Sequence, residues 1–167
     1  MNRIPDIIGH NLKILFIGYN PGLKSAETGH HYASPSNRFW KLLFESGITP
    51  YRFKPEEDVK LLDLGYGSTN IVSRPTRGAA ELKSEEFREG AVVLKELLAK
   101  YKPVIACYVG MGVYKRFSGR QRVGYGLQKD SIVEGVRDYV CPSPSGLNRM
   151  PYSTQLEYFR DMKSVSE

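Results

Sequence analysis

The sequence predicts an α/β fold in which helices cover both faces of a mainly parallel sheet. Three short runs, at residues 14–17, 104–109 and 136–141, are rich in β-forming residues, and each is followed by glycine or proline. Runs of this kind are typical of strands that are buried on both faces. Segments with the apolar spacing of helices lie between them, and this alternation favours parallel strands joined by helices.

Helical segments are expected between and after these strands. Residues 37–44 are amphipathic, and Pro55 opens a second segment whose next three residues are acidic, as the helix dipole favours. Ser84 is the expected N-cap of a third helix, in which apolar residues recur at helical spacing until Pro103 sets its limit. The last helix is expected to begin after Ser153.

Size and composition describe a single domain, residues 1–167. The chain is 41% hydrophobic and 25% charged, without an apolar stretch long enough to cross a membrane or the apolar part of a signal peptide. We therefore expect a cytoplasmic protein, associated with the nucleoid if it is prokaryotic. The net charge of +6 is compatible with a polyanionic partner, although no run of five like charges occurs.

The cysteines and histidines argue against a metal site. Cys107 and Cys141 are too few for a four-thiolate zinc or iron–sulfur site, and both are expected to be buried. The adjacent His30 and His31 would point apart in an extended chain, and no carboxylate cluster accompanies them. We expect neither a metal nor a cofactor.

Two glycine-containing turns look like nucleotide-binding motifs but fail their spacing rules. Residues 110–112 follow a strand and precede a helix, yet Lys115 stands where the third glycine of a dinucleotide fingerprint belongs. We interpret them as a tight strand-to-helix turn. In residues 18–25, Leu23 separates the last glycine from the following lysine, so the phosphate-loop interpretation is rejected.

Two long segments without periodicity, residues 19–36 and 142–151, each follow a predicted strand. They should therefore emerge at the same edge of the sheet, where open α/β proteins bind ligands. The first begins Gly-Tyr-Asn-Pro-Gly, in which glycine and proline allow close backbone approach and fix the direction of Asn20. The second holds Leu147 among turn formers. Taken alone, Leu147 is explained by inward packing, but it could also wedge into a base stack, with Arg149 on a phosphate or the opposing base.

Together the two loops resemble motifs of the uracil-DNA glycosylase superfamily, most closely its mismatch-specific uracil- and thymine-DNA glycosylase branch. The first motif is matched by residues 18–41, Gly-Tyr-Asn-Pro-Gly-Leu-Lys-Ser-Ala-Glu-Thr-Gly-His-His-Tyr-Ala-Ser-Pro-Ser-Asn-Arg-Phe-Trp-Lys, and the second by residues 143–149, Ser-Pro-Ser-Gly-Leu-Asn-Arg. Residues 61–63 and 73–76 resemble the connecting region. The resemblance implies a three-layer α/β/α sandwich around a short, mainly parallel sheet.

The resemblance also implies roles for individual residues. Asn20 would position the water that attacks C1′ of a flipped nucleotide, because its amide oxygen can accept a hydrogen bond. The base pocket would be formed by Gly18, the backbone of Tyr19, Gly22, the stacking ring of Tyr32, Asn70 and Ser143. The hole in the duplex and the opposing base or phosphate would be met by Ser145, Gly146, Leu147, Asn148 and Arg149.

Three motif positions keep a second explanation. Asn37 and Arg38 match the family motif, but helix capping and packing explain them equally well. Asn70 lies at the end of a segment, residues 68–70, that is either a short strand or a turn. It would contact the base and extend activity to uracil opposite adenine, or it is simply a turn asparagine.

Departures from the efficient uracil-specific branch imply a slower enzyme. Asn20 stands in place of that branch's aspartate, so the carboxylate that would stabilise an oxocarbenium ion is absent. Gly22 replaces a bulky tyrosine, which leaves room for a 5-methyl group. Cys141 replaces the histidine that donates to the leaving base, and loss of one such donor typically costs about 100- to 1,000-fold. Such an enzyme should depend on a weak base pair to let the base flip.

The implied activity is that of a monofunctional DNA glycosylase that hydrolytically removes uracil from mismatched double-stranded DNA, chiefly G·U or G·T. Thymine and etheno-cytosine are further candidate bases, and no lysine is suggested as a Schiff-base nucleophile. A monomer is expected, with an abasic-site endonuclease acting downstream. The alternatives are a broader uracil-DNA glycosylase active on A·U and single strands, a non-catalytic mismatch or abasic-site binding protein, and a nucleoside hydrolase, on which Leu147 would have no purpose.

Overall fold

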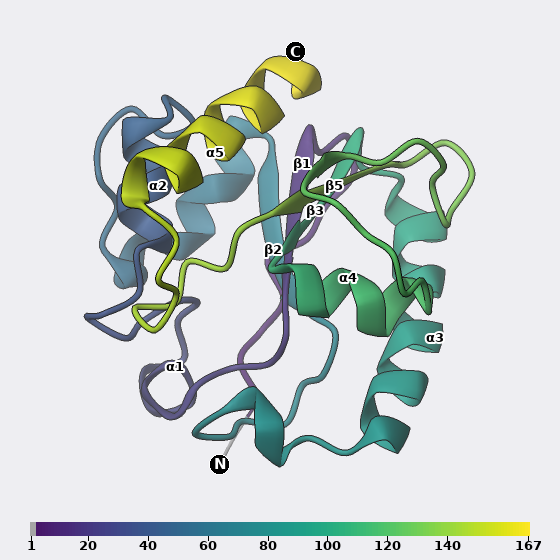
Figure 1. Ribbon diagram of the computed structural model, residues 1–167. Helices are drawn as coiled ribbons and strands as arrows, with labels where there is room; N and C mark the ends of the chain where they lie inside the picture. The colour runs from purple at the N-terminus through teal and green to yellow at the C-terminus, as the bar shows by residue number, and fades with distance from the viewer. Residues whose placement is uncertain (1–2) are drawn as a thin grey trace.

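The computed structural model describes residues 3–167 and has the predicted α/β architecture (Figure 1). Five strands form one sheet in the order β2-β1-β3-β5-β4. The first four of these are parallel, and the short β4 pairs antiparallel with β5 at the edge. The strands are β1 (Ile14–Gly18), β2 (Tyr66–Asn70), β3 (Ile105–Val109), β4 (Gly126–Leu127) and β5 (Arg137–Cys141).

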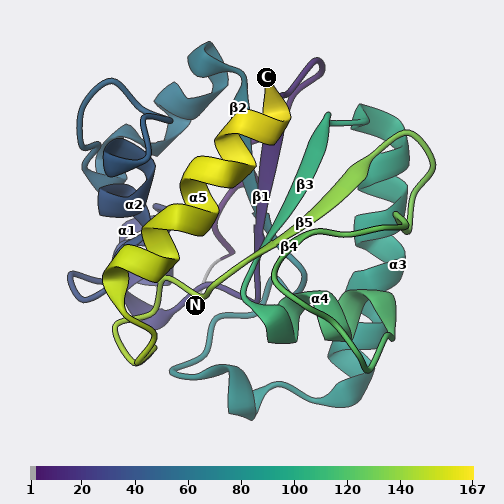
Figure 2. The ribbon, with the colours of Figure 1, turned by 45° about the horizontal axis from the view of Figure 1, so that its top comes forward.

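Helices cover the sheet on both sides, so the three-layer arrangement is confirmed. Figure 2 shows α2 and α5 on one side of the strands and α3 and α4 on the other. The α-helices are α1 (Leu23–Thr28), α2 (Phe39–Glu45), α3 (Ser84–Tyr101), α4 (Met111–Ser118) and α5 (Tyr152–Ser166), and two 3₁₀ helices span Pro55–Leu64 and Ala79–Glu81. None of the helices within residues 3–167 is long and apolar enough to cross a membrane.

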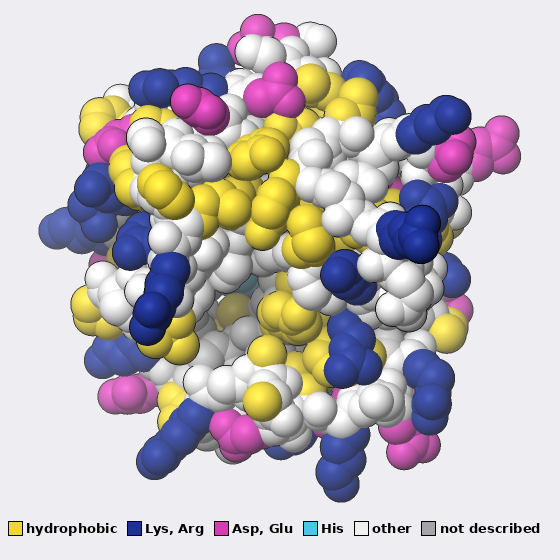
Figure 3. Space-filling view, viewed as in Figure 1, with side chains coloured by type: hydrophobic (Ala, Val, Ile, Leu, Met, Phe, Trp, Pro, Cys, Tyr) yellow, Lys and Arg dark blue, Asp and Glu magenta, His cyan; other side chains and the backbone are white. Residues whose placement is uncertain are grey.

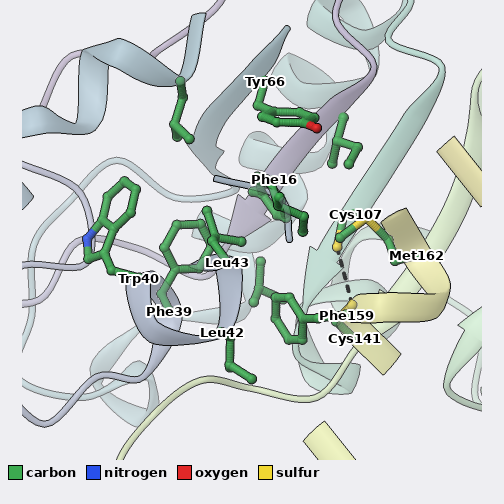
Figure 4. Close-up of a cluster of buried hydrophobic side chains, with 14 of the residues drawn as sticks. Phe16, Phe39, Trp40, Leu42, Leu43, Tyr66, Cys107, Cys141, Phe159 and Met162 are labelled. Carbon is green, nitrogen blue, oxygen red and sulfur yellow. Dashed lines mark hydrogen bonds between the residues drawn. The ribbon is translucent and has the colours of Figure 1, made fainter. Parts of the chain in front are cut away.

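The core consists of two apolar clusters, one on each face of the sheet, because successive strand residues point to opposite sides. Phe16 and Cys107 face α2 and α5, whereas the neighbouring Ile17 and Tyr108 face α3 and α4. Figure 4 shows the first cluster, in which the predicted burial of Cys107 and Cys141 is confirmed and their sulfur atoms lie 3.5 Å apart.

The elements differ from the predicted ones in several places, and neither the short β4 nor the 3₁₀ helix at Ala79–Glu81 was predicted. The loop after β1 contains the short helix α1, which ends at Gly29 in the left-handed conformation. The segment opened by Pro55 is a 3₁₀ helix rather than an α-helix. A fourth parallel strand, β2, has the sequence Tyr-Gly-Ser-Thr-Asn, which carries no apolar run.

Strand β2 is buried although it is polar, because its side chains have hydrogen-bond partners. Ser68 Oγ lies 2.8 Å from His31 Nδ1, and Thr69 Oγ1 donates to Asp6 Oδ1 (2.7 Å). A buried polar group costs little when it is paired in this way. The strand thus stands beside β1 with Asn70 in register with Gly18, at the carboxyl ends of both strands.

Replacement of Gly90 by alanine is expected to destabilise the protein, although alanine is the better helix former. A Cβ on Gly90 of α3 would lie 2.0 Å from Ile71 O, at the end of β2. Overpacking typically costs about 1–3 kcal/mol or more, which outweighs a helix-propensity gain of about 1 kcal/mol.

The free energy of unfolding from urea titrations measures this effect. The matched control is Gly124→Ala, whose Cβ would meet nothing within 4 Å, and it should stay within about 0.5 kcal/mol of the wild type. Equal stability of Gly90→Ala and the wild type would contradict the close contact between Gly90 of α3 and the carbonyl of Ile71.

Candidate active site

A cavity of about 320 Å³ opens at the carboxyl ends of β1 and β2. The predicted site residues Asn20, Gly22, Tyr32 and Asn70 all line it, together with Ile4, Pro21, Leu23, Lys24, Ser25, His31, Ser34, Asn37 and Arg77. Figure 3 shows this face of the molecule hollowed near the carboxyl ends of the strands, with Lys and Arg side chains around the hollow. The volume is within the range of cavities that enclose small ligands.

The Asn20 amide is held in one orientation. Its Nδ2 donates to Arg74 O (2.7 Å) and to Thr76 Oγ1 (2.8 Å). The Thr76 hydroxyl in turn donates to Gly78 O (2.8 Å), so it can only accept from Asn20. Because both acceptors require an N–H group, the amide nitrogen faces them and Oδ1 remains available to accept a hydrogen bond.

Tyr32 forms an aromatic wall of the cavity. Its ring stacks on Phe39, with centroids 3.8 Å apart and planes 13° from parallel. The residue adopts φ 50°, in the left-handed region that non-glycine residues seldom occupy. Its hydroxyl is buried and has no hydrogen-bond partner among the described residues, and burial raises the pKa of Tyr32 well above its ordinary value. The phenol is therefore neutral.

Gly18 provides the space in which Tyr32 and Asn70 approach each other. A Cβ on Gly18 would lie 2.9 Å from the Tyr32 hydroxyl and 2.8 Å from Asn70 Oδ1. The surroundings of Gly22 are open instead of crowded, since a Cβ there would meet nothing within 4 Å. Any larger residue at position 22 would extend into open space at the cavity rim.

Three predicted pocket residues, Gly18, Tyr19 and Ser143, do not line this cavity. The ring of Tyr19 packs against Phe87, with centroids 5.9 Å apart, and its hydroxyl reaches the position that a Cβ on Gly112 would occupy. The Tyr19 carbonyl accepts a hydrogen bond from Val72 N (2.9 Å). Ser143 lies beyond the cavity, beside Gly110, and its Oγ accepts a hydrogen bond from Ser145 N (3.3 Å).

Buried polar contacts fix His31, next to the stacking ring. His31 Nε2 lies 2.7 Å from Pro5 O and must donate to it, so Nδ1 accepts from the Ser68 hydroxyl. The backbone N–H of His31 donates to Asp58 Oδ2 (2.9 Å), and Asp58 is itself buried. Burial lowers the pKa of His31, although Pro5 O and the nearby carboxylates oppose the shift. The imidazole is thus a neutral structural group.

The cavity carries no carboxylate. Among its lining residues in the described chain there is no Asp or Glu, and its exposed cations are Lys24 and Arg77. Within residues 3–167, no three His, Cys, Asp or Glu side chains gather where they could hold a metal ion. The polar side chains of this lining include the uncharged amides of Asn20, Asn37 and Asn70.

The second predicted loop places Leu147 in solvent, with 90% of its surface exposed. The alternative that Leu147 packs inward is therefore wrong. The loop behind it is rigid, since Asn148 Nδ2 donates to Ser143 O (2.9 Å) and Leu147 N donates to Ser145 Oγ (3.2 Å). Arg149 is exposed beside it.

Arg38 joins the two loops. Its backbone N–H donates to Pro144 O (2.8 Å), and its Nη1 donates to Asn148 O (3.2 Å). A Cβ on Gly146 would lie 2.8 Å from Ser36 O, so the loops are in close contact. Asn37 Oδ1 accepts from Phe39 N (2.9 Å) at the start of α2, which supports helix capping for Asn37 and loop packing for Arg38.

Two comparisons with known proteins bear on the family and the fold. The family model of the uracil DNA glycosylase superfamily matches residues 5–164. The fold is similar to the solution NMR structure of a protein from Methanosarcina acetivorans described as a putative uracil DNA glycosylase, with a TM-score of 0.63 and 23% sequence identity over 96% of this chain and 97% of that one.

The chain belongs to the uracil-DNA glycosylase superfamily. It is accordingly a DNA glycosylase, a hydrolase that breaks N-glycosidic bonds in base excision repair, and the family supports uracil as the base that it removes.

Sequence reasoning did not assign roles to the residues that orient the site residues. Arg74 and Thr76 were recognised only as part of the motif-like segment 73–76, and His31 only as one of two adjacent histidines. The sequence does carry one signal for them. The Asn20 amide has two N–H groups that need acceptors, and the polar segment 73–76 can supply such acceptors.

The neutral His31 makes stability depend on pH in a defined direction. Its pKa is lowered in the folded protein, so the unfolded chain binds more protons below the ordinary value of about 6.5. The contribution of His31 to the free energy of unfolding should be complete above pH 6.5 and should be lost as the pH falls through the pKa that His31 has in the folded protein. Urea unfolding between pH 7.5 and 5.5 measures this slope.

His31→Gln should be less stable at pH 7.5 by about 1–3 kcal/mol, because it leaves buried partners unsatisfied, but its slope with pH should be shallower. The control His10→Gln changes an exposed histidine and should retain the wild-type slope. Identical slopes in the wild type and His31→Gln would exclude His31 as the titrating group.

Proposed function

We propose that this enzyme acts on mismatched duplex DNA and hydrolyses the N-glycosidic bond of uracil opposite guanine, with thymine opposite guanine and etheno-cytosine as further substrates. The observation that carries this proposal is the fixed Asn20 amide, whose oxygen is left free to accept a hydrogen bond and which lines a cavity without Asp or Glu, together with Tyr32, whose ring is supported from behind by the buried Phe39. A flipped base can stack on the exposed side of Tyr32, which leaves C1′ of its sugar near Asn20.

The proposed reaction is hydrolytic and needs only water as co-reactant. The bond between C1′ and the base nitrogen breaks with its electron pair on the base, and the sugar becomes cationic in character. A water molecule that donates a hydrogen bond to Asn20 Oδ1 adds its oxygen to C1′, and its proton passes to solvent or to the departing base. The neutral amide aims the water but cannot act as a strong base.

The environment supports slow departure of the base. Cys141 stands where efficient relatives have a donating histidine, but its thiol is buried against Cys107 in the core. Burial raises the pKa of Cys141 well above its ordinary value, so the thiol stays neutral. Backbone N–H groups of the loop after β1 would have to stabilise the charge that develops on the base.

Mismatch dependence follows from the weakness of this chemistry. A slow enzyme gains from bases that leave the stack easily, and flipping costs least when the base is mispaired. The open space at Gly22 is compatible with a 5-methyl group, which supports thymine as a substrate. The protein is proposed to act as a monomer in the cytoplasm, with an abasic-site endonuclease taking over its product.

A broader activity is the second candidate, and Asn70 favours it. Asn70 lines the cavity beside Tyr32, where its amide can bond the edge of a base. An additional base contact of this kind would offset a higher flipping cost, and A·U pairs and single strands would then be substrates as well.

Asn20→Ala is expected to lose base release by at least about 100-fold, because the water loses the oriented acceptor that directs it to C1′. Duplexes with G·U, G·T or A·U, and single-stranded uracil DNA, are incubated with excess enzyme in EDTA. Alkali then reveals abasic sites as strand breaks, and the single-turnover rates rank the substrates.

Circular dichroism of Asn20→Ala controls for folding. Release from G·U that is lost in this variant supports the proposal, and equal rates on A·U and single strands would favour the broader activity. Binding without any release would favour the lesion-binding alternative, and strand cleavage without alkali would contradict a monofunctional reaction.

Leu147→Ala should reduce release from duplex DNA by at least about tenfold. Unstacking a base costs a few kcal/mol, and the leucine side chain offsets part of this cost by filling the position that the base leaves. Release from single-stranded DNA should change little, because no stack needs filling. The same single-turnover assay measures both. The control Leu127→Ala removes another exposed leucine, on β4, and equal losses on both substrates would contradict a wedge.

A further inference from the structure

We propose that the ion pair between Arg74 and Glu86 positions the Asn20 amide for catalysis. Arg74 Nε donates to Glu86 Oε1 (2.7 Å), and its Nη2 donates to Glu86 Oε2 (3.0 Å). Such a two-point contact fixes direction as well as distance. The role rests on the proposed function, since it presumes that Asn20 directs the water.

The ion pair acts on Asn20 through the backbone of Arg74. The carbonyl oxygen of this residue is the closer of the two acceptors of the Asn20 amide. Residues 71–78 belong to no helix or strand, and backbone hydrogen bonds tie the segment to the Asn20 loop on either side of Arg74, from Val72 N to Tyr19 O (2.9 Å) and from Thr76 N to Pro21 O (3.2 Å). Pro75 follows directly and restricts the Arg74 backbone to extended conformations. The side chain of Arg74 then anchors the middle of an otherwise irregular segment.

The other end of the anchor is fixed on α3. Glu86 Oε2 also accepts from Lys83 N (2.8 Å), which caps the first turn of this helix. Arg74 Nη2 makes a further contact, to Glu81 O (3.2 Å). Since α3 packs into the core through Phe87 and against Ile71 through Gly90, the carboxylate has a rigid support.

The carboxylate is ionised under all assay conditions. Its contact with Arg74 and the N–H of Lys83 lowers the pKa of Glu86 to about 2. The pair is therefore intact throughout the neutral range, and changes of pH near 7 leave the anchor unaltered.

A competing role for Arg74 is phosphate binding, since its side chain is half exposed and lines a second cavity, which adjoins the first at Asn70. The two roles predict opposite effects of Glu86→Gln. If Arg74 is a phosphate ligand held back by Glu86, the variant frees the guanidinium and tightens DNA binding. If the pair is an anchor, the variant leaves DNA affinity unchanged and slows the chemical step.

The test is single-turnover release of uracil from G·U duplex, together with the Kd for a duplex carrying a non-hydrolysable 2′-fluoro-deoxyuridine. Glu86→Gln and Arg74→Lys should each lower the maximal rate by roughly 10- to 100-fold, as misplacement of a positioned group does, with Kd within twofold of the wild type. The double variant should be no slower than the slower single variant, because both act through one contact.

The Asn20 side-chain amide provides a readout that does not depend on activity. Its two N–H resonances, assigned by their loss in Asn20→Ala, should shift in Glu86→Gln and in Arg74→Lys. The controls Glu85→Gln and Arg88→Met change exposed charges on the same turn of α3 and should leave rate, Kd and resonances unchanged. Thermal unfolding of every variant establishes that it is folded.

Each remaining outcome contradicts one proposal. An active wild type with an equally active Glu86→Gln and unshifted Asn20 resonances overturns the anchor. Tighter DNA binding at wild-type rate overturns it in favour of phosphate binding. A wild type inactive on every substrate overturns the proposed function, and the catalytic role of the anchor with it.

Discussion

The orientation of the Asn20 amide is the constraint on which the rest of the site depends. An amide has a donor end and an acceptor end, and only the acceptor end can receive a hydrogen bond from the attacking water. Two acceptors on the segment after β2 occupy the donor end, and the Thr76 hydroxyl cannot reverse its role because it donates to Gly78 O. The parallel register of β1 and β2 brings these segments together, since Gly18 pairs with Asn70.

Most of the fold is predictable because apolar runs and helical spacing are local properties of the sequence. Strands β1, β3 and β5 and helix α3 were predicted from such patterns within a few residues. For β2 the sequence left a short strand and a turn as alternatives, because the burial of this strand depends on partners far away in the sequence: Ser68 is paired with His31 and Thr69 with Asp6. A polar strand with distant partners has no periodic signal.

The same distinction applies to the site. Asn20, Tyr32 and Leu147 could be singled out because they belong to loops that resemble a known family, and the structure places the first two in one cavity and the third in solvent. The groups that orient Asn20 lie 54 and 56 residues away along the chain, at Arg74 and Thr76, and the contact of His31 with Pro5 spans 26 residues. No composition or spacing rule encodes such a contact.

Charge explains why the proposed enzyme would select its substrate before the chemistry. The described lining of the cavity holds no Asp or Glu, its His31 imidazole is neutral, and the Cys141 thiol lies in the core rather than at the cavity. Little in this lining would therefore stabilise the oxocarbenium ion of the proposed reaction. The exposed Lys24 and Arg77 would attract the phosphates of any DNA sequence equally. On this proposal, discrimination rests on how easily a base leaves the stack and on the exposed Leu147, whose loop is tied to the first loop by the contacts of Arg38.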